Sequence, residues 1–475
     1  MDQKLIDALH ATRKVQSDEA RPDIVARVHS NGRMTARERM AALLDADSAV
    51  EYGSIAGQTS DGEWVAEAGG VDFVGTIGGQ VVIASSTDYT DHGGGYGAGR
   101  LGRLFALAEE HRWPLVFFVD GGGSRARHPR SGQGHLEFSG PIGRFTIIDG
   151  NAELSGWVPT IAIVSGPSFA GHASLAAFSD FLIATGGSSI GIGGPPMVEA
   201  ALGVRLSAHE LAGVEMHEKR GGIDLLVTDD AASIHAARKY LAYYSDLPFG
   251  KPSASAHRIN SLVSENQHYD MHHVIESLVD ADSVFELRPR FAPALITALA
   301  RIEGRSIGVL ANQPLIDDGA IDADAATKIS RFVELCDCYE YPIISLIDTP
   351  GCITRWQRKG EDLTTEAGMT RWHARPLIAH QNRTVPLVSI QIRRGYGLGP
   401  ALMSGFSSGR GVPALCLAWP TLEVGRTDGF SAIRYKTAID DVVTPAETRD
   451  KIARVLRHIK RTFNQTEKKH SIDTW

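Results

Sequence analysis

The stretch WPLVFFVDGG, residues 113–122, has a close counterpart in YPIISLIDTPG, residues 341–351. Each consists of an aromatic residue and a proline, a mainly apolar run, and then an aspartate with a glycine-rich turn. Such a short apolar run before a turn is typical of a strand buried on both faces. The two prolines stand 228 residues apart. One half of the chain therefore resembles the other.

A second pair of stretches follows the first at matching distances. WVPTIAI (157–163) leads into the turn GPSFAG (166–171), and TVPLVSI (384–390) leads into GYGLG (395–399). The aspartate and the second proline are 39 residues apart in the first half and 38 in the other. This spacing indicates a tandem duplication. Strands that alternate with helical stretches predict an α/β fold with largely parallel strands.

Composition predicts two globular domains. The segment 246–256 is rich in Pro, Gly and Ser and follows a helical stretch at 232–244, so we expect domains at 1–250 and 251–475. The net charge of -8 gives no reason to expect a nucleic-acid or membrane partner. Apolar runs are too short to span a bilayer and no secretory signal is visible, so we expect a cytoplasmic protein.

The cysteines predict neither a metal site nor disulfides. Cys336 and Cys338 lie two residues apart in a stretch with helical periodicity, and such positions do not face each other. No second Cys pair or nearby His pair completes a zinc site. We expect reduced, structural cysteines.

The glycine-rich turns are candidate anion sites. Small residues where a strand passes into a helix leave backbone N–H groups available to developing negative charge. Tight packing alone would also explain the glycines. The same arrangement at the same place in both halves favours a function.

Other motifs are weaker. GAGRLG (97–102) lacks the acidic residue of a dinucleotide site, and the patterns GSSIG (187–191) and GFSSG (405–409) do not join a clear strand to a helix. They do not favour a serine hydrolase. The basic cluster that contains Arg125 and Arg127 is either a solvated loop or a phosphate contact beside a strand end.

Several motifs together resemble the carboxyltransferase (β) subunits of biotin-dependent acyl-CoA carboxylases, of the propionyl-CoA and acetyl-CoA carboxylase type. They are GRMTARER (32–39), DGGGSR (120–125), HELAG (209–213), GVLANQP (308–314) and DTPG (348–351). The resemblance covers nearly the whole chain. It implies a tandem duplication of two crotonase-like domains, each a spiral of ββα units.

The resemblance also implies partners and a reaction. The family forms head-to-tail dimers, often trimers of dimers, in which a carboxyl group moves from carboxybiotin to the α-carbon of an acyl-CoA thioester. The N-terminal domain holds the acyl-CoA and the C-terminal domain holds biotin. The chain has no M-K-M-like biotinylation motif, so biotin would come on a separate carrier, supplied by a biotin carboxylase subunit.

The family's site residues can be carried over by position. The oxyanion hole for the thioester enolate falls on Ala170 and Gly171. The hole for the ureido oxygen of biotin falls on Leu398 and Gly399, with Gly397 beside it. Each hole needs N–H donors, and losing one donor typically costs about 2.7–4 kcal/mol of barrier.

Four further residues are expected on the CoA side of the site, and a fifth residue, His172, has two possible roles. The four are Arg125, Arg127, Gly194 and Pro195. His172 directly follows the first hole, where the family has a small residue. It is either a packed helix residue or a proton-transfer group in an altered chemistry.

Departures from the family pattern lie mainly in the C-terminal half. Leu398 adds bulk in the second hole, the stretch after Glu423 is short, and residues 356–375 are unfamiliar. We therefore expect a weakened or remodelled biotin site. The alternatives are a biotin-independent decarboxylase, hydrolase or C–C lyase on a CoA thioester, and a non-catalytic assembly subunit.

Overall fold

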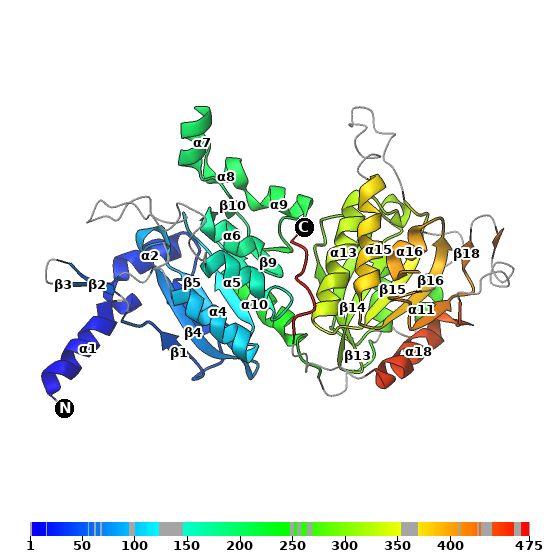
Figure 1. The fold of residues 1–475 in the computed structure, drawn as a ribbon, viewed down its shortest axis with the longest axis horizontal. Coiled ribbons are helices and arrows are strands. Elements are labelled where there is room, and N and C mark those ends of the chain that lie inside the picture. The colour runs from blue at the N-terminus through cyan, green and yellow to red at the C-terminus, as the bar shows by residue number, and fades with distance from the viewer. Residues whose placement is uncertain are drawn as a thin grey trace. The chain divides into compact units, whose positions relative to one another are not determined.

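The computed structural model divides into two compact units, residues 1–242 and 243–473 (Figure 1). Each unit contains one large sheet with helices packed on it. The structure describes residues 2–15, 17–55, 57–60, 63–66, 69–94, 100–122, 146–247, 251–253, 258–263, 268–352, 369–406, 409–424, 427–428, 439–459 and 467–474.

The first unit is built on a seven-stranded sheet in the order β1-β4-β5-β6-β7-β9-β11. Its strands are β1 (Val50–Tyr52), β4 (Gly70–Ile77), β5 (Gln80–Thr87), β6 (Leu115–Phe118), β7 (Thr160–Val164), β9 (Phe181–Thr185) and β11 (Leu225–Val227). Strands β4 and β5 form an antiparallel hairpin, and β5 to β11 run parallel along the sheet. Every residue of β6 and β7 is buried, as expected for parallel strands covered on both faces.

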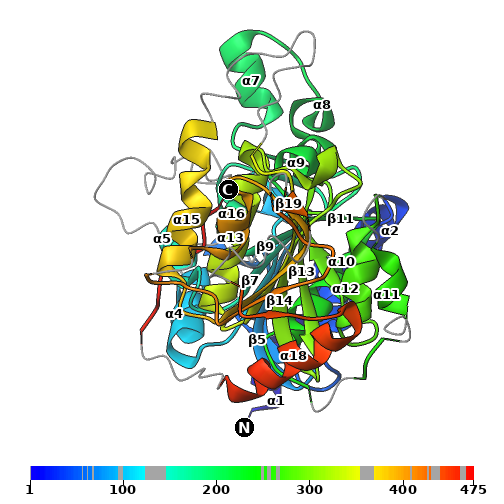
Figure 2. The same ribbon diagram turned by 90° about the vertical axis from the view of Figure 1, so that its right-hand side faces the viewer.

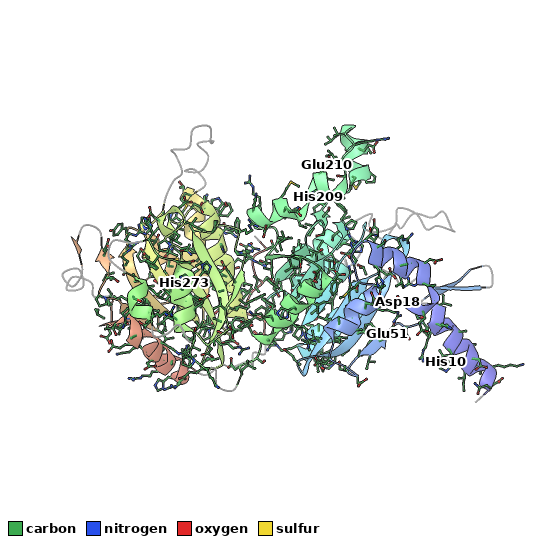
Figure 3. All side chains as sticks on the ribbon, turned by 180° about the vertical axis from the view of Figure 1, so that it is seen from behind. His10, Asp18, Glu51, His209, Glu210 and His273 are labelled. Carbon is green, nitrogen blue, oxygen red and sulfur yellow. The ribbon has the colours of Figure 1, made fainter. Side chains whose placement is uncertain are left out.

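Two small strand pairs and several helices complete the first unit. The pairs are β2 (Gly57–Ser60) with β3 (Glu63–Ala66), and β8 (Pro167–Phe169) with β10 (Ser189–Gly191). The helices are α1 (Gln3–Val15), η1 (Asp18–Ala20), α2 (Pro22–Ser30), α3 (Ala36–Leu43), η2 (His92–Gly94), α4 (Arg100–His111), α5 (Thr146–Leu154), α6 (Gly171–Ala177), α7 (Pro195–Leu202), α8 (Ala208–Ala212), α9 (Val214–Arg220) and α10 (Asp230–Ala242). Helices α7 to α9 extend outward from the sheet, and Figure 3 labels His209 and Glu210 on α8.

The second unit has a sheet whose main path is β12-β13-β14-β15-β16-β17-β20. Its strands are β12 (Phe285–Leu287), β13 (Leu295–Ile302), β14 (Arg305–Asn312), β15 (Ile343–Thr349), β16 (Leu387–Gly395), β17 (Leu415–Ala418), β18 (Glu423–Val424), β19 (Thr427–Asp428) and β20 (Asp441–Val442). Its helices are α11 (Ile259–Leu262), α12 (Met271–Leu278), η5 (Asp317–Gly319), α13 (Ala323–Cys338), α15 (Ala374–Asn382), α16 (Gly399–Ser404) and α18 (Pro445–His458).

The two sheets repeat each other strand for strand. In both, an eight-residue antiparallel hairpin is followed by parallel strands, and the two hairpins pair in the same register. Strand β15 lies between β14 and β16, as β6 lies between β5 and β7. The tandem α/β duplication predicted from the two aspartate-bearing stretches is therefore confirmed.

The core of the second unit shows how apolar spacing fixes the layers. Helices α11, α12 and α18 pack their buried residues on one face of the sheet, through side chains such as Val274, Ile452 and Leu456. Helix α13 contacts β13 and β14, and Figures 1 and 2 show α13 and α18 on opposite sides of the strands. Burial of both sheet faces makes this unit a three-layer structure.

An ionic clamp holds the start of α12. His272 Nδ1 lies 2.7 Å from Asp270 Oδ1, and its Nε2 lies 3.0 Å from Glu286 Oε2 on β12. The hydrogen bond to Glu286 and the adjacent Asp270 raise the pKa of His272 to about 9. The imidazole is therefore charged at neutral pH and joins α12 to the edge strand.

Three further observations concern the described part of the chain. No helix there is long and apolar enough to cross a membrane. No cluster of three His, Cys, Asp or Glu side chains among those residues could hold a metal ion. All four cysteines lie in described segments and none forms a disulfide, and Cys336 and Cys338 are buried on α13.

Candidate active site

The two glycine-rich turns occupy equivalent places in the two units. In the first unit β7 leads through β8 to α6, which begins at Gly171. In the second unit β16 leads to α16, which begins at Gly399. The strand-to-helix passage predicted in each half is confirmed. Each turn follows a strand that lies next to the aspartate-bearing strand of the same sheet, β7 next to β6 and β16 next to β15.

The first turn has one occupied and one available amide. Ala170 has φ 53° and ψ −123°, a conformation that favours glycine. Its N–H donates to the carbonyl oxygens of Gly191 and Ile192, both at 3.2 Å. The N–H of Gly171 has no acceptor among the described residues, and a Cβ added to Gly171 would meet no atom within 4 Å. The open donor at this turn is therefore Gly171.

The segment after β10 lies beside the first turn. Its carbonyl groups receive the N–H of Ala170, and a Cβ on Gly194 would lie 3.7 Å from the ring of Phe169. Gly194 caps α7 and Pro195 is its first residue. These two expected residues are thus brought near the turn. Arg125 and Arg127 lie outside the described residues.

The second turn differs in which amides are occupied. The N–H of Gly399 donates to the carbonyl oxygen of Tyr396 at 3.2 Å. The N–H groups of Gly397 and Leu398 have no acceptor in the part of the chain that the structure describes. Both residues are exposed, and Leu398 keeps 38% of its surface accessible. The open donors therefore lie one residue earlier than the pair expected from the family pattern.

A buried ion network fixes the base of the first turn. Arg39 on α3 is almost fully buried and reaches Asp120 at 2.9 Å and Asp230 at 3.2 Å. Asp120 accepts the N–H groups of Ser165 and Gly166, each at 2.9 Å. The carboxylate thereby orients the segment that leads into β8 and Ala170. Sequence reasoning noticed the motif of residues 32–39 but did not assign Arg39 this role.

A matching network supports the second turn. Asp348 near the end of β15 is fully buried, forms ion pairs with Nε of Arg394 at 2.9 Å and Nε of Arg393 at 3.2 Å, and accepts a hydrogen bond from the hydroxyl of Tyr269 at 2.9 Å. Arg393 and Arg394 lie directly before the turn. Each unit therefore neutralises its strand-end aspartate with arginine. The arginine comes from a distant helix in the first unit and from the neighbouring strand in the second.

His172 lies inside the first unit and does not face solvent. It is 2% exposed, and its Nε2 is 2.8 Å from the carbonyl oxygen of Gly94. Burial lowers the pKa of this imidazole below its usual value, although the bond to Gly94 opposes the shift. The ring is therefore neutral at neutral pH.

A cavity of about 880 Å³ lies between α2 and the carboxyl ends of β5, β6, β7, β9 and β11. Arg21 and Arg39 in its wall are paired with aspartates. Arg27 and Arg33 also line it, and neither forms an ion pair with a described residue. Arg33 lies against Gly166, where an added Cβ would come within 2.4 Å of its Nη1. Two guanidinium groups thus remain for a bound anion.

Comparison with known proteins agrees with this geometry. Residues 27–465 match the carboxyl transferase domain family. The chain is 31% identical to the methylmalonyl-CoA carboxyltransferase 12S subunit of Propionibacterium freudenreichii subsp. shermanii, over 94% of this chain and 92% of that protein. It is 31% identical to the propionyl-CoA carboxylase beta chain of Saccharopolyspora erythraea, over 89% of this chain and 80% of that protein.

A solved structure gives the same result. The hexameric transcarboxylase 12S, crystallised with methylmalonyl-coenzyme A and methylmalonic acid, matches with a TM-score of 0.84 at 28% identity, over 98% of this chain and 99% of that one. The crotonase-like fold of both units is thereby confirmed. The chain belongs to the carboxyl transferase family.

Proposed function

We propose that this chain is the carboxyltransferase subunit of a biotin-dependent acyl-CoA carboxylase. It moves a carboxyl group from carboxybiotin to the α-carbon of an acyl-CoA thioester. The observation that carries the proposal is the pair of equivalent strand-end turns, where the N–H of Gly171 in one turn and those of Gly397 and Leu398 in the other have no acceptor among the described residues. Membership of the carboxyl transferase family and the names of the relatives support the same reaction.

The first turn acts on the thioester. When the α-carbon loses its proton, negative charge moves to the thioester oxygen, and a fixed N–H donor stabilises that charge. Gly171 supplies this donor from a position that open space surrounds. Ala170 acts mainly by holding the turn, since its own N–H is bonded to the segment after β10.

The second turn fits the ureido group of biotin. Carboxybiotin, delivered by a separate carrier subunit together with biotin carboxylase, supplies the carboxyl group. Gly397 and Leu398 offer exposed N–H groups to its ureido oxygen, while Gly399 keeps the turn closed through its bond to Tyr396. The Leu398 side chain beside these amides is 38% exposed and adds bulk where the relatives of this family are expected to have a small residue. This feature also favours the alternative, a biotin-independent decarboxylase, hydrolase or lyase on a CoA thioester.

The coenzyme would lie on the first unit. Arg33 and Arg27 supply cations for its phosphate groups in the cavity beneath α2, and Gly194 with Pro195 would flank the thioester arm. Arg125 and Arg127 remain proposed contacts of the same coenzyme. We propose that the first domain, expected at 1–250 and compact over residues 1–242, binds the acyl-CoA, and that the second domain, expected at 251–475 and compact over residues 243–473, binds biotin.

We expect a homo-oligomer, either a dimer or a trimer of dimers. The solved relative is a hexamer. Helix α7 has no buried residue, and its Met197 and Leu202 are 66% and 72% exposed. Exposed apolar side chains on one projecting helix are typical of a subunit interface. Light scattering measures the assembly directly.

The test uses the reverse reaction. The purified chain is incubated with malonyl-CoA, methylmalonyl-CoA and longer carboxyacyl-CoA thioesters, with and without free biotin, and mass spectrometry identifies the products. Carboxyl transfer is supported if the thioester loses its carboxyl group only when biotin is present and carboxylated biotin is formed. Decarboxylation at the same rate with and without biotin supports the alternative. A folded chain that turns over none of these thioesters contradicts both.

A further inference from the structure

His172 lies at the first turn, and its imidazole already forms a hydrogen bond within the protein. Because a carbonyl oxygen only accepts, Nε2 carries the hydrogen and donates it to Gly94. The backbone of Phe169 also bonds the ring, so the neutral imidazole is held by backbone groups of the protein. Proton transfer to a substrate would have to break the bond to Gly94. The contacts of the ring therefore point to a different role.

The loops around His172 are already tied to one another. The N–H of Gly121 donates to Pro167 at 2.7 Å, and Phe169 returns a bond to Gly121 at 2.8 Å. Gly122 donates to the carbonyl oxygen of Gly93 at 3.1 Å. The loops that follow β5 and β6 and the short strand β8 thus form one connected surface behind the turn.

His172 closes this connection from the helix side. Its backbone belongs to α6, directly after the open amide of Gly171, and its Nε2 holds Gly94. The ring also fills the space over Gly121, where an added Cβ would lie 2.4 Å from it. One side chain therefore joins α6 to the loops after β5 and β6.

The second unit holds the corresponding glycine carbonyl with a residue from a different element. Asn312 ends β14, and its Oδ1 accepts the N–H of Asp348 at 3.2 Å. Its Nδ2 donates to the carbonyl oxygen of Gly319 at 3.1 Å. The helix position that corresponds to His172 is Pro400, which has no N–H. Asn312 alone therefore performs two tasks: it accepts the N–H of the strand-end aspartate and it donates to the carbonyl oxygen of the glycine.

In the first unit these two tasks are divided. Thr87 ends β5 at the place of the asparagine, and its hydroxyl accepts the N–H of Asp120 at 2.8 Å. That hydroxyl gives its own hydrogen to Phe118, so it cannot serve Gly94. His172 does so instead.

Gly94 and Gly319, whose carbonyl groups accept these bonds, have the same backbone conformation and the same close neighbour. Gly94 and Gly319 each stand seven residues after their strand end, with φ 76° and 77°. An added Cβ would lie 2.4 Å from the carbonyl oxygen of Asp120 in one and 2.6 Å from that of Asp348 in the other. The two carbonyl groups are therefore equivalent targets.

We propose that His172 is a positioning residue that fixes the Gly94 carbonyl beside the thioester turn, the task that Asn312 performs for Gly319. It acts through the backbone of the loops and not as an acid or base. The inference depends on the proposed function only for its activity measurement. Its stability measurement stands alone.

The experiment transfers the asparagine from the second unit to the first. Four proteins are compared with the wild type: His172→Ala, Thr87→Asn, the double variant Thr87→Asn/His172→Ala, and His10→Ala on the exposed α1 as a control. Thermal unfolding measures how much the bond to the Gly94 carbonyl stabilises the fold. The kcat, the KM and the pH–rate profile, measured in the biotin-dependent assay, show whether the thioester turn still functions.

We expect His172→Ala to lower the melting temperature, and to lower kcat about 10-fold or more because the turn shifts, without changing the pH–rate profile. Thr87→Asn alone is also harmful, since its amide meets the imidazole. In the double variant the asparagine reaches Gly94, so stability recovers and kcat returns to within about 3-fold of the wild type. His10→Ala changes neither quantity.

Two results would overturn the inference. One is the loss of an ionisation from the pH–rate profile of His172→Ala, which would make the imidazole an acid or base. The other is a folded double variant no more stable than His172→Ala. If the wild type transfers no carboxyl group, recovery of stability still supports the positioning role, while the proposed function fails.

Discussion

Replacing Gly171 by proline removes the open N–H of the first turn. Gly171 is the first residue of α6, a position where proline is well tolerated because its N–H has no partner within the helix. A side chain there meets no atom within 4 Å. Ala170, which precedes it, has φ 53° and ψ −123°, outside the extended region that a residue before proline adopts, so the turn must adjust to accept the proline.

The expected loss is large because the donor acts on charge that develops during the reaction. One missing oxyanion donor costs about 2.7–4 kcal/mol, or about 10²–10³ in kcat. Gly171→Ala is the matched reference, since it adds the side-chain carbon and keeps the N–H. The comparison of proline with alanine therefore isolates the hydrogen bond.

The assay measures kcat and KM for a CoA thioester with both variants, and thermal unfolding checks that each is folded. We expect kcat of Gly171→Pro to fall by the stated factor relative to Gly171→Ala, with a smaller change in KM. A folded proline variant whose kcat stays within about 3-fold of the alanine variant would refute the assignment.

Four further predictions concern other parts of the chain. Arg39→Ala leaves two buried carboxylates unpaired and should lower the free energy of unfolding by about 3–5 kcal/mol in urea titration, whereas Arg37→Ala on the same helix removes a half-buried pair and should cost less than about 1 kcal/mol. The pKa of His272 is raised to about 9, so its contribution to stability is complete below about pH 6.5 and is lost as the pH rises through 9; His272→Gln should flatten this part of the pH profile of thermal unfolding. Arg33→Ala should raise KM for an acyl-CoA about 10-fold and leave KM for the corresponding pantetheine thioester unchanged; an equal effect on both would contradict a phosphate contact. Leu398 has φ −84°, near that of proline, so Leu398→Pro should fold and lose about 10²–10³ in kcat relative to Leu398→Ala; equal rates would exclude its N–H as a donor.

The sequence was sufficient to predict the repeat because the repeat is a matter of spacing. The aromatic-proline entries, apolar runs and terminal aspartates recur at fixed intervals, and a buried strand needs nothing else to be recognised. Local patterns thus predict elements whose causes are local.

Partners that lie far apart in the chain could not be predicted. Arg39 meets Asp120 and Asp230 across 81 and 191 residues, and no local pattern records such a choice. For the same reason the sequence could not show that the N–H of Ala170 is already hydrogen-bonded, because its acceptors lie about twenty residues later. His172 could be noticed as unusual, but its role became visible only beside Asn312.

The buried arginine of α3 also constrains the order in which the chain can fold during synthesis. Arg39 leaves the ribosome early, while Asp230 is made 191 residues later, about 10–40 s at usual rates of translation. Throughout this interval one of its two carboxylate partners does not yet exist. The first unit can therefore close only when α10 emerges. A nascent chain of this protein should stay sensitive to proteases until that helix has been made, and should become resistant in a single late step.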